Sequence, residues 1–208
     1  MSEPRFITLE EAFGLLENSP KSTVQQEMSV HLEAFAEFVE DESSRIALYE
    51  GDITLPYLAV KDDIVIVNGN LTVPGILEDC LEVNISLLLV LGNVTTNHLF
   101  TFSQICIAGN LTVSNTIVAD SACDYSLDVG ENLKAHLIIE SGHWFDIKGN
   151  ITADYIYGWH SSKERKGILA TNLTEKDFIG EIDNDSRLEL GTAMQYLMRN
   201  QPILRNAL

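Results

Sequence analysis

The sequence predicts a mainly β protein: a right-handed parallel β-solenoid of about six coils, with an α-helical N-terminal cap and a mixed, partly helical C-terminal cap. The first observation is a glycine that opens a short β-prone phrase six times, at successive intervals of 18, 23, 17, 21 and 19 residues. A repeat of that length is one structural unit, which buries its apolar face only by stacking on its neighbours. The six phrases are Gly51-Asp-Ile-Thr, Gly69-Asn-Leu-Thr, Gly92-Asn-Val-Thr, Gly109-Asn-Leu-Thr, Gly130-Glu-Asn-Leu and Gly149-Asn-Ile-Thr.

The second observation is a hydrophobic period of two between residues 51 and 158. Leu81, Val83 and Ile85, for example, alternate with polar residues, as expected of a half-buried strand. A β-sandwich also uses short strands with frequent turns, but the return of one phrase at one place in each cycle favours the solenoid. The residues predicted for the core point inward from successive coils: Leu71, Val73, Leu81, Val83, Ile85, Leu89, Leu91, Ile105, Ile107, Leu111, Val113, Ile138, Ile147 and Ile151.

Residues 1–50 are predicted to be helical and to cover the open end of the first coil, because bare strand edges invite pairing with other chains. Thr8 and Glu11 have the spacing of a capping box at the start of a first helix, which the Asn-Ser-Pro cluster at 18–20 ends. Apolar residues at three- and four-residue steps predict a second helix over 23–48.

Residues 159–208 are predicted to cover the last coil. The pattern indicates one helix from Thr174 and a final helix from about Asp185 to Met198, with an apolar stripe of leucine and methionine residues. The solenoid spans 51–158, and the three segments are expected to form one compact unit.

The chain is strongly acidic, with 31 acidic and 13 basic side chains and a net charge of −18. Between Lys61 and Lys134 there is no Lys or Arg. Such a surface disfavours nucleic acid and anionic membranes, whose binding depends on Lys and Arg. It favours solubility and the capture of a basic partner.

The three cysteines, Cys80, Cys106 and Cys123, are odd in number and match no zinc spacing. Their apolar neighbours are typical of small buried side chains. The N-terminus has no cleavable signal pattern, and no stretch approaches 18 uninterrupted apolar residues. These features predict a protein of the reducing cytoplasm, without a membrane partner.

Motifs of catalysis are scarce. No nucleophile elbow, P-loop or dinucleotide fingerprint is present. Stacked coils could bring His98, His136 and His143 together, and the pairs Asp62-Asp63 and Glu78-Asp79 could act as general acids or hold a cation. Adjacent acids at a coil corner are more often simply solvated. We therefore expect no catalytic residue, cofactor or metal and no enzyme activity, while glycoside hydrolysis by a carboxylate pair stays open.

Three phrases carry a resemblance to known repeat proteins: Val67-Asn-Gly-Asn-Leu-Thr-Val73, Ala108-Gly-Asn-Leu-Thr-Val113 and Ile147-Lys-Gly-Asn-Ile-Thr-Ala153. They resemble bactofilin-like polymer-forming β-solenoids, and also the solenoid proteins that accompany bacterial toxins and are taken to be their immunity proteins. The resemblance covers about half of the chain, from about residue 64 to 157. Its motifs belong to turns and core, so they imply fold more than activity.

Two features favour the immunity branch. Bactofilin-type scaffolds have short disordered tails that leave the solenoid ends free, whereas this chain has long patterned segments at both ends. A net charge of −18 opposes self-association and suits a basic toxin domain. The expectation is a non-catalytic, cytoplasmic immunity protein, with a bactofilin-like scaffold as the alternative. The expected docking residues are acidic: Glu33, Glu37, Glu40, Asp41, Asp62, Asp63, Glu78, Asp79 and Asp124.

Overall fold

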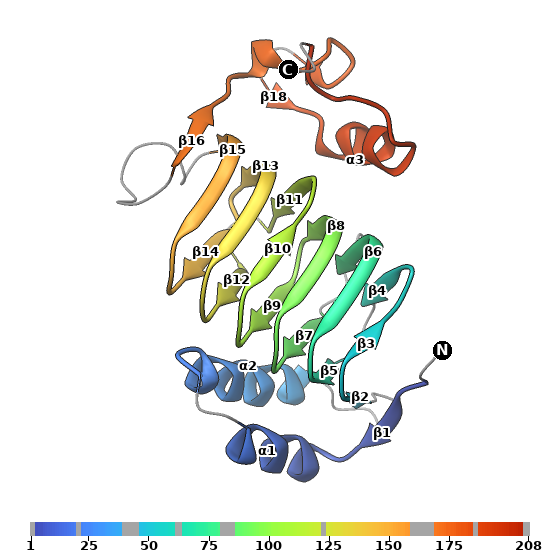
Figure 1. Ribbon diagram of the computed structural model, residues 1–208, viewed down its shortest axis with the longest axis vertical. Coiled ribbons are helices and arrows are strands. Elements are labelled where there is room, and N and C mark those ends of the chain that lie inside the picture. Colours follow the sequence, from blue (N-terminus) through green and yellow to red (C-terminus); the bar gives the residue numbers. More distant parts are fainter. Residues whose placement is uncertain are drawn as a thin grey trace.

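The computed structural model describes residues 3–19, 22–38, 46–60, 64–79, 86–121, 124–158, 169–184 and 187–205. The chain forms a β-solenoid of about six turns, with helices near both ends of the sequence (Figure 1). Each turn contributes a strand to one sheet, passes a glycine corner and contributes to a second sheet. Among the described solenoid strands every pairing is parallel, which confirms the solenoid and excludes the antiparallel sandwich.

The first sheet has the order β1 (Arg5–Ile7), β2 (Ile46–Glu50), β5 (Ile64–Asn68), β7 (Leu87–Val90), β9 (Gln104–Ile107), β12 (Ser126–Val129) and β14 (Trp144–Ile147). The second has the order β16 (Leu169–Asn172), β15 (Ile151–Gly158), β13 (Leu133–Ser141), β10 (Leu111–Val113), β8 (Val94–Thr101), β6 (Leu71–Asp79) and β3 (Ile53–Thr54). Two further strands join the second sheet: β11 (Thr116–Asp120) between β8 and β13, and β4 (Leu58–Val60) beside β6. A separate two-stranded ribbon contains β17 (Asp183–Asn184) and β18 (Arg187–Leu188).

A ladder of side-chain amides runs along the glycine corners. The backbone N–H and the side-chain amide of Asn93 both donate to Asn70 Oδ1, at 2.8 and 3.0 Å. Asn110 donates in the same way to Asn93 Oδ1, at 2.8 and 3.1 Å. The same pair of bonds links all six rungs: Asp52, Asn70, Asn93, Asn110, Asn132 and Asn150. The Gly-Asn phrase therefore recurs because each corner bonds the one before it.

The interior of the solenoid is apolar, and the sequence identified much of it. Eight of the predicted residues pack there as one buried cluster: Leu71, Val73, Ile105, Ile107, Leu111, Val113, Ile138 and Ile151. Leu89 is buried on the outer side of the first sheet, beneath the helices, while Leu91 and Ile147 are only partly buried. Leu81, Val83 and Ile85 lie outside the described residues.

The helices cover the two flanks of the solenoid. Helices α1 (Leu9–Asn18) and α2 (Gln25–Phe38) pack on the outer side of the first sheet, where Met28 and Leu32 join one buried cluster with Leu89. In Figure 1, α2 runs alongside several coils. Helix α3 (Leu190–Met198) packs on the outer side of the second sheet. The prediction placed these segments over the ends; at the first coil, the end strand β2 is instead bordered by β1, which pairs with it antiparallel.

Three predicted helices differ from the observed structure. The final helix begins at Leu190 and not near Asp185, because Arg187–Leu188 forms strand β18. Within the described residues the second helix ends at Phe38, and Ile46–Glu50 is strand β2. Ile46 and Leu48 of that strand pack under the helices while Ala47 faces the solenoid interior. Both faces of this segment are buried, as a strand between the helices and the core requires. At the C-terminus the expected helix from Thr174 is one 3₁₀ turn at Glu175–Asp177.

The capping box is confirmed: Thr8 accepts from the backbone of Glu11, and the Glu11 side chain accepts from the backbone of Thr8. No helix among the described residues is both long and apolar enough to span a bilayer.

Candidate functional site

The outer face of α2 is the acidic surface that the structure describes best. Val24, Met28 and Leu32 face the sheet and are buried, whereas Glu33 and Glu37 are exposed on the opposite side of the helix. Val30, one turn before Glu33, is 55% exposed. An exposed apolar residue beside two carboxylates on a rigid helix has the chemistry of a docking ridge. We call this surface, formed by Val30, Glu33 and Glu37, the α2 ridge.

Two cationic side chains near this flank are already engaged by carboxylates. Arg5 lies 3.5 Å from Glu11 and 3.4 Å from Glu50. Lys148 Nζ lies 3.0 Å from Glu27 and 2.8 Å from Asp146, and these two hydrogen bonds raise its pKa. Neither cation is paired with Glu33 or Glu37, so the field of the α2 ridge stays negative.

The other predicted docking residues divide into three groups. Asp124 is exposed and remains a candidate contact. Glu40, Asp41, Asp62 and Asp63 lie outside the described residues. Glu78 and Asp79 are only 3% and 1% exposed, so these two side chains leave almost no surface for a partner.

The burial of Asp79 has a structural cause. Its carboxylate accepts from Thr101 Oγ1 at 2.8 Å and from the backbone of Ser103 at 3.2 Å, both on the next coil. Glu78 accepts from the hydroxyl of Tyr57. The prediction that Glu78 and Asp79 form part of a docking surface is therefore wrong. Both carboxylates are buried and accept hydrogen bonds from other coils.

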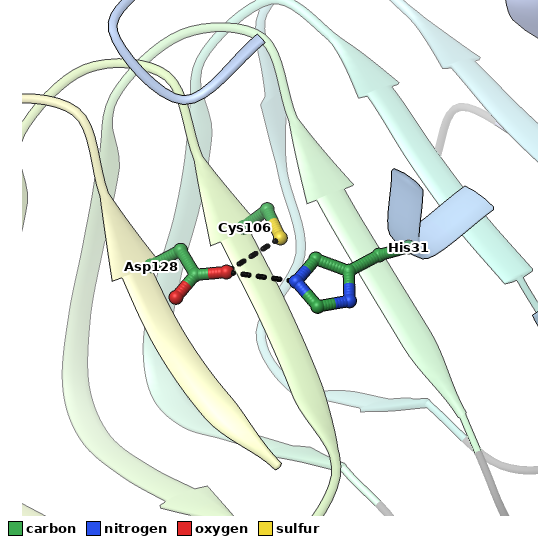
Figure 2. A group of neighbouring side chains, drawn as sticks. All are labelled: His31, Cys106 and Asp128. Carbon is green, nitrogen blue, oxygen red and sulfur yellow. Dashed lines mark hydrogen bonds and ion pairs between the residues drawn. The ribbon is translucent and has the colours of Figure 1, made fainter. Parts of the chain in front are cut away.

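A polar cluster of two buried residues and the partly exposed His31 lies between α2 and the first sheet (Figure 2). Asp128 Oδ2 is 3.2 Å from His31 Nε2 and 3.4 Å from Cys106 Sγ. Gln104 donates to the same oxygen at 2.9 Å. Burial, followed by the nearby charge of Asp128, raises the pKa of the Cys106 thiol well above its usual value. Cys106 is thus a buried, protonated thiol and not a nucleophile.

The sequence carried one weak signal for this cluster: Cys106 and Asp128 are about one coil apart, a separation that spacing rules for metal sites do not consider. Cys106 and Asp128 are direct register partners in β9 and β12, and His31 reaches them from a helix 75 positions or more away in the chain. Spacing rules for metal sites search along the chain, whereas a solenoid aligns residues one coil apart. The three possible ligand atoms of His31, Cys106 and Asp128 all lie within 4.8 Å of one another. In the described part of the chain, no other three His, Cys, Asp or Glu side chains meet this criterion.

On the opposite flank, a cavity of about 310 Å³ lies between the second sheet and the C-terminal segment. Coil stacking brings His98 and His136 to its wall, together with Thr116 and Tyr155; His143 does not line it. His136 Nδ1 is 2.6 Å from Asp154. The described lining contains no Asp or Glu, so a pair of carboxylates for glycoside hydrolysis does not converge there.

His98, in the wall of this cavity, is a buried polar side chain whose contribution to stability can be tested. It is 2% exposed, and neither ring nitrogen has a hydrogen-bond partner in the described part of the chain; burial lowers its pKa. An unsatisfied buried polar group costs about 1–3 kcal/mol. His98→Leu is therefore expected to raise the free energy of unfolding by about 1 kcal/mol in urea denaturation.

The matched control is His136→Leu, because His136 is partly exposed and pairs with Asp154, so this change should give no gain. A loss of stability in His98→Leu would show that the imidazole has a polar partner in the folded protein.

Comparisons with protein-family models, with curated proteins and with solved structures found no match to this chain.

Proposed function

We propose that this protein is a non-catalytic binding protein that docks the α2 ridge on a basic protein partner, and that the partner is a bacterial toxin domain that it neutralises. The observation that carries the proposal is the exposed pair Glu33 and Glu37 beside the exposed Val30. This combination offers an apolar contact centre with carboxylates around it, which is how protein interfaces combine affinity with selectivity.

The rest of the molecule supports this role. A net charge of −18 accelerates encounter with a basic partner. The helix that carries the ridge is fixed by burial of its opposite face on the solenoid, so docking requires little ordering of the backbone.

The amide ladder argues against the alternative of a bactofilin-like scaffold that polymerises end to end. Its first rung is Asp52, which accepts from Asn70. In a head-to-tail stack that continued the ladder, Asp52 would have to follow Asn150 and donate to its side-chain oxygen. The backbone N–H of Asp52 could still donate, but its carboxylate has no N–H to replace the side-chain amide and repels that oxygen. The strand β1, antiparallel to β2, would also have to be displaced.

Charge reversal on the ridge tests the proposal. Glu33→Lys and Glu37→Lys, each alone, should weaken the affinity for the proposed basic toxin domain by at least about tenfold, which corresponds to about 1.4 kcal/mol. Titration calorimetry at two salt concentrations measures both the affinity and its salt dependence.

The matched control is Glu181→Lys, which makes the same change in net charge at an exposed position in the C-terminal segment. Its affinity should stay within about twofold of the wild-type value, since only the long-range field changes. Equal losses in all three variants would mean that net charge, and not the α2 ridge, determines binding.

A further inference from the structure

We propose that His31, Cys106 and Asp128 form a zinc site that fastens α2 to the solenoid, with water as the fourth ligand. The proposal is independent of the partner that the α2 ridge binds. The three side chains are an imidazole, a thiol and a carboxylate, which are the ligand types that zinc takes in proteins. A thiolate beside an imidazole also disfavours magnesium and calcium, which prefer oxygen ligands.

The scaffold holds the three ligands in place. Cys106 and Asp128 stand opposite each other on β9 and β12, two adjacent parallel strands. His31 comes from the face of α2 that lies over these strands (Figure 2). Ligands from strands and a packed helix keep their geometry better than ligands from loops.

The distances to Asp128 are those of a tetrahedral ion. Zinc bonds of about 2.0–2.1 Å to nitrogen, 2.0–2.2 Å to oxygen and 2.3 Å to sulfur require ligand atoms to be roughly 3.3–3.6 Å apart. Two of the three separations are close to this range: 3.2 Å from His31 Nε2 to Asp128 Oδ2 and 3.4 Å from Cys106 Sγ to the same oxygen. The third, from His31 Nε2 to Cys106 Sγ, is within 4.8 Å. For the ion to bind, the His31 side chain has to bring Nε2 to the tetrahedral distance from Cys106 Sγ.

The hydrogen bonding at Asp128 is a second, independent observation. Three groups converge on its Oδ2: Gln104 Nε2 at 2.9 Å, His31 Nε2 at 3.2 Å and Cys106 Sγ at 3.4 Å. One carboxylate oxygen has about two lone-pair sites, so three donors exceed what it can accept. An ion at the centre relieves this conflict, because it takes the places of the imidazole and thiol protons.

The proton balance of binding is simple. Cys106 loses its thiol proton to solvent and binds as the thiolate. The proton that His31 Nε2 donates to Asp128 in the metal-free protein moves to Nδ1 by way of solvent, which leaves the Nε2 lone pair for zinc. Gln104 continues to donate to Asp128 and Cys106, as outer partners of metal ligands commonly do. The side chain of His31 is 28% exposed and that of Asp128 4%, so the ion enters from the side of His31.

Metal binding by the full-length protein tests the site directly. The wild-type protein, treated with chelator and dialysed, should take up one equivalent of Zn²⁺ and melt at a higher temperature. With Co²⁺ as the probe, it should show the near-ultraviolet band of cobalt bound to a thiolate. Cys106→Ser should lose that band, and His31→Gln should lower zinc affinity by more than about 100-fold, since even outer-shell changes cost 10–100-fold.

His136→Gln is the control, because this histidine lies on the opposite flank beside Asp154; its metal binding should equal that of the wild type. The proposal is overturned if Co²⁺ in tenfold excess gives no thiolate band with the wild type. It is equally overturned if His31→Gln, at a partly exposed position that should fold even where Cys106→Ser does not, binds zinc as tightly as the wild type.

Discussion

Gly92→Ala is expected to lower the free energy of unfolding by about 3 kcal/mol or more. A Cβ at this position would lie 2.6 Å from the carbonyl oxygen of Gly69 and 2.7 Å from Asn70 Oδ1. These atoms belong to the preceding coil, whose backbone is held by the amide ladder on both sides. The clash can be relieved only by separating two coils, so the stacking of the whole solenoid opposes the substitution.

The matched control is Gly14→Ala in α1, where a Cβ would meet nothing within 4 Å. There the change should stabilise the protein by about 0.5–1 kcal/mol, because alanine favours a helix interior over glycine. Urea denaturation of both variants measures the contrast. Equal stabilities for Gly92→Ala and the wild type would mean that the coils are not in contact at the glycine corners.

Two buried groups should give the pH dependence of stability opposite slopes. Burial raises the pKa of Asp79 to about 7 from the usual 3.8, with the adjacent Glu78 adding to the shift. Burial lowers the pKa of His143 to about 4 from 6.5, although Glu140 and Asp128 oppose the shift. Both groups are therefore neutral in the folded protein between about pH 4 and 6.5, where each ionises in the unfolded chain.

The signs differ because one group is an acid and the other a base. The stability that Asp79 contributes is fully present below pH 3.8 and is lost as the pH rises to about 7. The contribution of His143 is fully present above pH 6.5 and is lost as the pH falls to about 4. Because a tenfold change in an ionisation constant corresponds to about 1.4 kcal/mol, each group contributes about 3–4 kcal/mol across its range. The two contributions therefore nearly cancel in the wild type.

Single variants should reveal the two slopes. Asp79→Asn removes the acid, so its stability should fall from pH 7 to pH 4 more steeply than that of the wild type. His143→Phe removes the base, so its stability should rise over the same range. Urea denaturation at half-unit pH steps measures both profiles, and parallel profiles for the three proteins would mean that neither group is buried in the folded state.

The fold could be predicted because its determinants repeat. Gly69, Gly92 and Gly109 each mark a corner with an asparagine beside it, and one corner type at regular intervals specifies stacked coils. The fifth corner shows the limit of the motif: Glu131, not Gly130, occupies the stacked position, since its N–H bonds Gly109 and its carbonyl accepts from Gly149. This one-residue shift from Gly130 to Glu131 is set by the pairing of neighbouring coils and cannot be read from the motif.

The positions of the helices and the candidate sites were less predictable. An amphipathic helix such as α2 must cover an apolar surface, but the pattern does not distinguish the end of a solenoid from its flank. Leu89 illustrates this. The alternating pattern shows that Leu89 is on an apolar face of its strand, but it does not show that this face lies outside the solenoid, beneath the helices. The cluster of His31, Cys106 and Asp128 depends on both the coil register and the helix position, so no single segment encodes it.

The most direct test of the central claim is hydrogen–deuterium exchange of the full protein, alone and bound to the proposed partner, a basic toxin domain. If the α2 ridge is the docking surface, peptides covering 25–38 should exchange more slowly in the complex, while peptides from α3 and 175–182 should be unchanged. Protection confined to the C-terminal flank, or no protection at α2 in a saturated complex, would contradict the account.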